Sequence, residues 1–282
     1  MKKKINLLPF ITILLLCVTS VVGILSMDFS KGYDVTNQYG TVVRIFGNGI
    51  YAHDSFFKAP ISIGTDFCIL FVLVPLFIYT YIRNITHNTN ISRVKLMSVY
   101  AVSFYYAASL SFGVTYNRLH LVYITLFACS LFGMFSVLRT IHINELNFKA
   151  SIGNNIFLIM AGIALIIAWL PDIIPTVFSR KSLSLIEIYT TEVTYVLDMG
   201  IIGPLCLVCL YLLKKGDNLG TLILAILLKT CIIVGIMMIP QTICQSLSGY
   251  EIALPAFIGK SAFFVVLGGF ALYFNKQLYS RL

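Results

Sequence analysis

The chain has 282 residues, 59% of them hydrophobic and only 11% charged, and its formal net charge is +9. Soluble domains carry about 25% charged residues, so the composition excludes a separate soluble domain and indicates one integral membrane domain over residues 1–282. The positive charge is then expected in loops that face an anionic lipid surface, and nucleic acid is not an expected partner.

Eight apolar runs approach the length of about 20 residues that a helix needs to cross a bilayer. Runs of this length exclude soluble strands, and the sequence predicts an all-α bundle of about eight spans in the cell membrane, surrounded by lipid. We expect the first run, which follows Lys2 to Lys4, to be a retained helix and not a cleaved signal peptide. The predicted spans are residues 7–27, 61–82, 96–116, 121–141, 155–171, 193–213, 219–240 and 252–274.

The Lys and Arg residues of the loops predict the orientation, because basic residues concentrate on the cytoplasmic side of a membrane protein. With the N-terminus inside, the 20 Lys and Arg residues divide into twelve inside, six outside and two, Lys229 and Lys260, within spans. The sequence therefore predicts that both termini are cytoplasmic and that the long loops 28–60 and 172–192 lie outside.

These two outer loops carry most of the sequence outside the spans. Loop 28–60 contains four glycines and three tyrosines, which favours a short hairpin or a lid. Pro171 and Pro175 are expected to end the fifth helix. A short amphipathic helix is expected in residues 182–195, and His53 with Asp54 is expected in a solvated loop.

Four charged residues fall inside predicted spans, and they are Asp66, Asp198, Lys229 and Lys260. A charge in hydrocarbon costs about 2.5–3.5 kcal/mol on insertion scales and usually faces the bundle interior. At 1.5 Å per residue these four lie roughly 8 to 16 Å below the outer boundary. We therefore expect them to meet in the outer half of the bundle, with Asn117 and Tyr123 as polar lining.

Three interpretations of this charged set stay open. The charges could form buried pairs that determine which helices meet. They could line a water-accessible cavity for an ion or a small polar solute, where Pro204, Pro240 and Pro255 would free backbone carbonyls. They could also form a catalytic site, although the sequence favours a protein that is not an enzyme.

Motifs for other chemistry are missing from the sequence. It has no phosphate-binding loop, no histidine pair at metal-ligand spacing and no nucleophile elbow. Cys206 and Cys209 have the spacing of a metal or redox pair, but they lie in an apolar run and no second pair accompanies them. We therefore expect neither a metal nor a cofactor.

Three blocks of residues carry a resemblance to a known family. They are Tyr51 to Asp54 with Asp66 and Pro75-Leu76, then Phe112-Gly113 with Asn117, Tyr123 and Ser130-Leu131, and then Val196-Leu197-Asp198 with Gly200, Pro204, Gly220 and Lys229. Over roughly residues 50–235 the chain resembles an uncharacterised family of bacterial and archaeal multi-pass membrane proteins. The resemblance implies no activity, but it implies that Asp66, Asn117, Asp198 and Lys229 belong to one recurrent set.

The leading functional hypothesis is the binding or transport of a small polar solute or ion through an outward-facing charged pocket. Its predicted residues are Asp66, Asn117, Tyr123, Asp198, Lys229 and Lys260. The two halves of the chain show no clear two-fold relation, which disfavours a transporter built from repeats. The alternative is a sensor or an accessory membrane subunit whose buried charges only determine helix packing.

Overall fold

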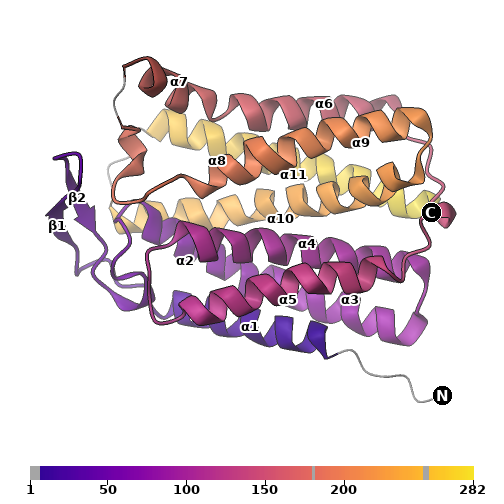
Figure 1. Cartoon of the computed structure of the whole chain (residues 1–282), viewed down its shortest axis with the longest axis horizontal. Coiled ribbons are helices and arrows are strands. Elements are labelled where there is room, and N and C mark those ends of the chain that lie inside the picture. Colours follow the sequence, from indigo (N-terminus) through magenta and orange to yellow (C-terminus); the bar gives the residue numbers. More distant parts are fainter. Residues whose placement is uncertain (1–6, 180–181, 250–253) are drawn as a thin grey trace.

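The structure, a computed structural model, describes residues 7–179, 182–249 and 254–282, without the side chains of Ser184 and of residues 254–260. Long helices lie side by side along one axis, with a small β-hairpin at one end (Figure 1). This arrangement confirms the predicted all-α class. The helices are α1 (Leu8–Ile24), α2 (Lys58–Cys68), α3 (Val74–His87), α4 (Asn90–Gly113), α5 (His120–Leu138), α6 (Ile152–Ile167), α7 (Leu170–Ser179), α8 (Val193–Leu197), α9 (Gly203–Lys215), α10 (Asn218–Ser248) and α11 (Leu254–Arg281).

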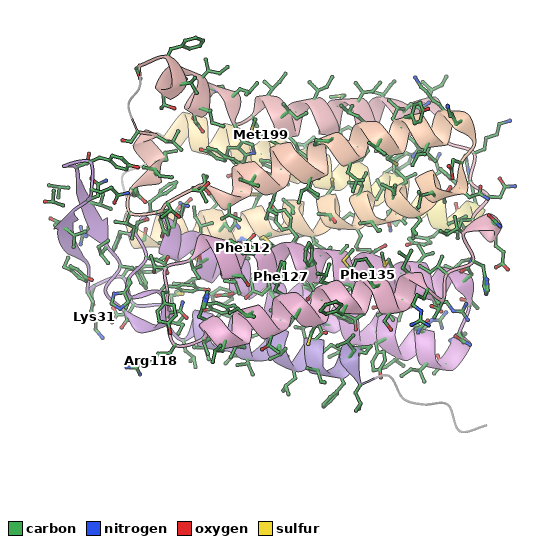
Figure 2. All side chains as sticks on the ribbon, viewed as in Figure 1. Lys31, Phe112, Arg118, Phe127, Phe135 and Met199 are labelled. Atoms are coloured by element: carbon green, nitrogen blue, oxygen red, sulfur yellow. The ribbon has the colours of Figure 1, made fainter. Side chains whose placement is uncertain are left out.

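Several of these helices join into longer apolar rods. Within the described residues, five helices are long and apolar enough to cross a membrane by length and composition. They are Lys58–His87, His120–Leu138, Ile152–Ser179, Val193–Lys215 and Asn218–Ser248. The apolar helix α1 is shorter, with 17 residues, while α4 and α11 have 24 and 28. Large apolar side chains such as Phe112 and Phe135 are exposed along the outside of the bundle (Figure 2), where lipid would cover them.

Two π-helical turns, η2 (Ile69–Leu73) and η5 (Asp198–Ile202), interrupt these rods. Each lies directly before a residue that is followed by proline, Val74 in one case and Gly203 in the other. Val74 N–H donates to the Ile69 carbonyl, and Gly203 N–H donates to that of Asp198. Proline has no N–H and its ring crowds the carbonyl four residues earlier, so a wider turn keeps each rod continuous.

The second outer loop agrees with its predictions only in part. The fifth helix, α6, ends at Ile167, shortly before Pro171, but the chain then resumes a helical course in α7. Pro171 lies in the first turn of α7, where a missing N–H costs no intrahelical bond, and the helix also accommodates Pro175. The helix expected over residues 182–195 is replaced by a 3-10 turn, η4 (Ser184–Ile186), and by the start of α8, because Glu187 adopts a positive φ of 48°.

The two ends of the bundle differ in structure and charge. At one end, strands β1 (Tyr33–Thr36) and β2 (Val42–Ile45) pair antiparallel, followed by the 3-10 turn η1 (Gly49–Tyr51). This confirms the hairpin predicted in loop 28–60, and Lys31 and Arg118 lie at this end in Figure 2. We call it the hairpin end.

At the opposite end, Figure 1 shows the α3–α4 and α9–α10 turns and the α5–α6 connection with its 3-10 turn η3 (Ile143–Glu145). Its basic residues include Arg83, Arg93, Arg139, Lys214 and Lys215, and we call it the basic end.

Helix α10 forms the centre of the bundle. It packs against α2, α4, α9 and α11, and more of its apolar length is buried than in the other four candidate spans. Helix α2 approaches α10 closely because Gly64 has no side chain, and a Cβ there would overlap the backbone of Gln241. The close approach places Thr65 and Asp66 of α2 within hydrogen-bonding distance of residues of α10 and α4, respectively.

Candidate functional site

Two aspartates are buried in the half of the bundle that adjoins the hairpin end. Asp66 lies on α2 and is fully buried, and Asp198 begins the π-turn η5 with 5% of its surface exposed. Each carboxylate accepts hydrogen bonds from two ring-bearing side chains, and neighbouring residues of α4, Tyr105 and Tyr106, supply one donor to each. The two aspartates share none of these donors, so they form separate sites.

The first site is the Asp66 cluster, defined as Thr19, Gly23, Tyr51, Asp66 and Tyr106. Tyr51 donates to Asp66 Oδ2 at 2.7 Å, and Tyr106 donates to Oδ1 at 2.5 Å. Thr19 Oγ1 lies 3.4 Å from the Tyr106 hydroxyl. A Cβ on Gly23 would overlap the carboxylate, so α1 closes the cluster from its side. The cluster joins α1, α2, α4 and the turn η1 around one carboxyl group.

The second site surrounds Asp198. Tyr105 donates to Oδ1 at 3.0 Å, and the indole N–H of Trp169, in the α6–α7 turn, donates to Oδ2 at 3.1 Å. The Trp169 ring stacks on Tyr195, with centroids 4.6 Å apart. Tyr195 in turn donates to Asp172 Oδ2 at 2.9 Å. Residues from α4, α7 and α8 therefore position a single carboxylate within a wall of aromatic rings.

A cavity of about 580 Å³ lies against this second site. We call it the Asp198 cavity. Tyr105, Trp169, Tyr195 and Asp198 form part of its lining, and the lining also includes residues of α2, α10 and α11. Most lining side chains are apolar, and Asp66 is not among them. The Asp198 cavity therefore has a largely apolar lining that includes the carboxylate of Asp198.

Polar pairs complete the lining of the Asp198 cavity. Gln241 of α10 donates to Thr65 Oγ1 of α2 at 2.7 Å. Lys58, the first residue of α2, forms an ion pair with Glu192, which directly precedes α8. The Lys58 ammonium also lies 4.0 Å from the centroid of the Tyr189 ring. These contacts join α2 to α10 and to the segment before α8 at the hairpin end.

Asp54, in the segment before α2, holds the hairpin end together. Its Oδ1 accepts from Thr115 N–H at 2.8 Å and from the Tyr189 hydroxyl at 2.9 Å. The Tyr189 hydroxyl accepts from Ser55 N–H at 3.1 Å, and Asp54 Oδ2 has no hydrogen-bond partner. Burial raises the pKa of Asp54 from 3.8 to about 6. The prediction of a solvated loop is wrong for Asp54, because three segments cover it and leave 1% of its surface exposed.

Asn117 and Tyr123 do not line the Asp198 cavity. Asn117 Oδ1 accepts from Leu119 N–H at 2.9 Å, which stabilises the turn before α5. The Tyr123 hydroxyl interacts with the Asn117 side chain, and its ring is buried on the side of Asp66. Both residues therefore support the region around the Asp66 cluster.

The structure does not bring the predicted set of four charges together. Among the described residues, Lys229 forms no ion pair with either aspartate, and it interacts electrostatically with Lys95, a second cation. Lys260 is a residue of α11, but its side chain lies outside the described part of the chain. The expected convergence of the three described charges is wrong. Depth along a helix predicts the height of a side chain and not the direction in which it points.

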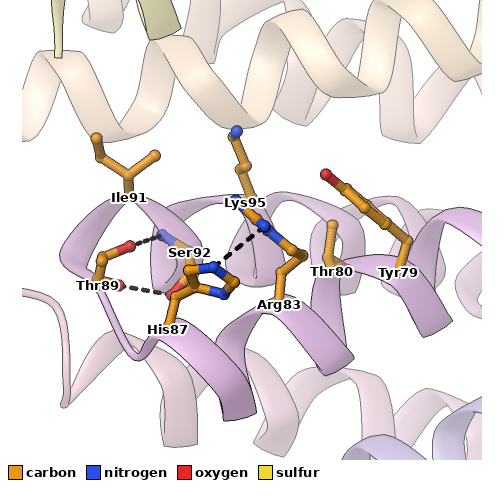
Figure 3. Close-up of a pocket in the computed structure, with 8 residues that line it drawn as sticks. All are labelled: Tyr79, Thr80, Arg83, His87, Thr89, Ile91, Ser92 and Lys95. Atoms are coloured by element: carbon orange, nitrogen blue, oxygen red, sulfur yellow. Dashed lines mark hydrogen bonds between the residues drawn. The ribbon is translucent and has the colours of Figure 1, made fainter.

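A second, small hollow lies at the basic end, between α3 and α4 (Figure 3). Its volume is about 100 Å³, and its lining includes Arg83, His87 and Lys95. Arg83 Nη1 lies 3.2 Å from His87 Nε2, and Thr89 caps α4 by accepting from Ser92 N–H at 3.1 Å. This hollow is therefore much smaller than the Asp198 cavity.

Sequence reasoning missed the donors of both aspartate sites. The sequence placed Tyr51 in an outer loop, and it connected neither Tyr51 nor Trp169 to an aspartate. The adjacent pair Tyr105 and Tyr106 within a predicted span was the available signal, because a buried phenol requires a hydrogen-bond acceptor. Asp66 and Asp198 were the two carboxylates predicted in the same half of the bundle, so they were the available acceptors.

The Asp198 site can hold a ligand that has an apolar body and one polar or charged group. Ligand pockets typically combine apolar and aromatic walls with a few convergent polar groups, and the Asp198 cavity has this composition. Comparisons of the chain with protein-family models, with curated proteins and with solved structures give no match.

Proposed function

We propose that this chain is a multi-pass protein of the cell membrane that binds a small solute in the Asp198 cavity. In this proposal it has about eight spans, its termini are cytoplasmic and the cavity opens to the outer side. Two features support the orientation. Helix α1 begins and α11 ends toward the basic end in Figure 1, and basic loops concentrate on the cytoplasmic side of membrane proteins.

The observation that carries the proposal is the volume of the Asp198 cavity beside a buried carboxylate. Its volume of about 580 Å³ lies within the range of roughly 300–1,000 Å³ that is typical of small-molecule sites. A core that serves packing alone fills its interior, because an empty space forfeits van der Waals contacts. A hollow of this volume at a carboxylate therefore supports a binding role over a packing role.

The alternative role, in which buried charges only determine helix packing, is favoured at the other aspartate. Gly23 packs directly against the Asp66 carboxylate, and Asp66 itself does not line the cavity, although Tyr106 of its cluster does. We therefore assign packing to Asp66 and binding to Asp198. The resemblance to an uncharacterised membrane family adds no activity to either role.

The single tryptophan of the chain makes the binding proposal testable. Trp169 lines the cavity and donates to Asp198, so a bound solute alters its fluorescence. The protein is purified in an uncharged maltoside detergent and titrated with three six-carbon solutes, hexyltrimethylammonium, hexane-1-sulfonate and hexan-1-ol. We expect a saturable change in Trp169 emission with at least one of them, and an unsaturable response to all three would contradict the proposal.

Thiol labelling tests whether the cavity opens outward. Ser109 lines the cavity, whereas Ser103 of the same helix does not line it and is fully buried. The two residues are otherwise alike, because each hydroxyl donates to the carbonyl four residues earlier. Ser109→Cys is expected to gain label from a membrane-impermeant thiol reagent added outside cells, relative to the parent chain with its seven cysteines. Ser103→Cys is the matched control and gains none. Equal labelling of the two variants would contradict an outward-facing cavity.

A further inference from the structure

The charge of the cavity lining is negative. Among the described lining residues, the ionisable carboxyl groups are those of Asp172, Glu192 and Asp198, and the cation is Lys58. Lys58 forms an ion pair with Glu192. With all four groups ionised, the lining has a net charge of −2, because three negative charges face one positive charge.

Asp198 is the carboxylate that the protein surrounds with neutral donors. Its hydrogen bonds come from the Tyr105 phenol and the Trp169 indole, and neither group carries a positive charge. A carboxylate has about four lone-pair sites, so two donors leave acceptor capacity. A buried charge is stabilised when it is paired with an opposite charge, and a cation in the cavity would supply that pair.

The remaining lining favours an organic cation. Tyr105, Tyr106, Trp169, Tyr195 and Phe264 contribute aromatic rings to the cavity, and aromatic faces attract ammonium groups, tryptophan most strongly. Hard inorganic cations such as calcium instead take six or more oxygen ligands, whereas the Asp198 cavity is lined mostly by carbon. Apolar residues such as Val234 and Met237 suit an alkyl or aryl body attached to the ammonium.

We propose that the Asp198 cavity binds an organic ammonium ion, with the cationic head beside Asp198 and the surrounding rings and its apolar body against α10 and α11. This inference rests on the proposed binding function and names its ligand class. Asp198 supplies the opposing charge, Tyr105 and Trp169 hold that carboxylate in place, and Tyr195 holds the Trp169 ring.

The three-solute fluorescence titration separates this inference from the proposed function. Hexyltrimethylammonium is expected to bind at least about tenfold more tightly than hexan-1-ol, since a desolvated cation–π contact alone is worth about that factor. Hexane-1-sulfonate is expected to bind more weakly than either. Saturable binding of the alcohol or the sulfonate with equal or higher affinity would overturn the ammonium assignment and leave the binding function intact. No saturable binding of any of the three would overturn both.

Two variants connect the charge preference to Asp198. Asp198→Asn keeps the shape of the side chain but removes its charge, and it is expected to weaken hexyltrimethylammonium binding at least about tenfold and to leave hexan-1-ol binding nearly unchanged. Asp34→Asn, the same change at an exposed hairpin residue, is the control and should bind as the wild type does. Unchanged ammonium affinity in Asp198→Asn would overturn the assignment.

A second measurement keeps the inference testable if Asp198→Asn does not fold. In Ser109→Cys, the reaction rate with a trimethylammonium methanethiosulfonate is compared with that of the sulfonate methanethiosulfonate of similar size. The ratio of these rates is normalised to the ratio at Thr41→Cys, an exposed site on the hairpin. A normalised ratio of about ten or more in favour of the cationic reagent is expected from the negative lining. A ratio of one or below would overturn the inference.

Discussion

The Asp66 cluster and the Asp198 cavity use the same hydrogen-bonding arrangement in different surroundings. In both, a buried carboxylate accepts from two ring-bearing donors, one of which is a tyrosine of α4. Asp66 is enclosed by α1 and the turn η1, whereas Asp198 lines a cavity of about 580 Å³. The space beside a buried carboxylate, and not its hydrogen bonds, therefore distinguishes a packing role from a binding role.

The backbone contributes to this difference. Asp66 lies within the regular helix α2, before the π-turn η2. Asp198 is the first residue of the π-turn η5, and its own carbonyl accepts the widened bond from Gly203. Such turns often occur at functional sites, and here the turn lies between α8 and α9.

The largest expected effect tests whether the Asp66 cluster is closed. Gly23→Ala places a methyl group on the Asp66 carboxylate, so it should lower the free energy of unfolding by more than about 3 kcal/mol, the upper end of the cost of overpacking. Gly269→Ala is the matched control, because a Cβ on that helical glycine meets nothing within 4 Å. Both are measured by thermal unfolding in maltoside. Equal stability of the two variants would show that the Asp66 cluster has unfilled space.

A third buried aspartate, Asp54 at the hairpin end, predicts a pH dependence of stability. Its pKa is about 6 in the folded protein, above its ordinary value of 3.8, so the folded state disfavours the charged form. The stability that neutral Asp54 contributes is fully present below pH 3.8 and is lost as the pH rises through about 6.

The measurement is the difference in unfolding free energy between wild type and Asp54→Asn at several pH values. We expect this difference to fall by about 2–3 kcal/mol between pH 4 and pH 7. Hydrogen exchange of residues 42–57 should accelerate over the same range in the wild type only. A difference that stays constant with pH would contradict a raised pKa.

A smaller effect compares the donors of the two aspartates. Tyr51→Phe leaves Asp66 Oδ2 without its donor in a closed site, which should cost about 1–2 kcal/mol of stability. Tyr105→Phe removes a donor from Asp198 beside the cavity, where water can replace it, so the cost should be below about 1 kcal/mol. Chemical unfolding of both variants tests this order, and a larger loss in Tyr105→Phe would reverse the roles of the two sites.

The smallest expected effect concerns Lys260, which the sequence placed in the same charged set. Its neighbour Ser261 lines the Asp198 cavity. Lys260→Gln removes a positive charge, and it should leave the binding of hexyltrimethylammonium unchanged or slightly tighter in the fluorescence titration. Loss of binding comparable to that of Asp198→Asn would instead indicate that these two residues act as a pair.

The sequence predicted the architecture better than the site. Long apolar runs specify helices directly, and the glycine-rich loop before α2 predicted the hairpin of β1 and β2. The presence of Asp66 and Asp198 in apolar runs indicated buried carboxylates, because a charge facing lipid is costly. These inferences depend on composition and length, which a single sequence contains.

The partners of the aspartates could not be predicted in the same way. Tyr51 reaches Asp66 from a 3-10 turn, and Trp169 reaches Asp198 because the chain continues from α6 into α7. Both contacts depend on how segments that are distant in sequence fold over the hairpin end. The lysines were matched to the aspartates by depth alone, whereas within the described part of the chain Lys229 forms no ion pair with either aspartate and interacts electrostatically with Lys95.

The affinity for hexyltrimethylammonium, measured through Trp169 fluorescence in Asp66→Asn and Asp198→Asn side by side, tests the distinction between the two aspartates most directly. The folded fraction of each variant is isolated by size-exclusion chromatography before titration. We predict at least about a tenfold loss of affinity in Asp198→Asn and less than about a twofold change in Asp66→Asn. Equal losses in both variants, or a loss confined to Asp66→Asn, would contradict the assignment of binding to one aspartate and packing to the other.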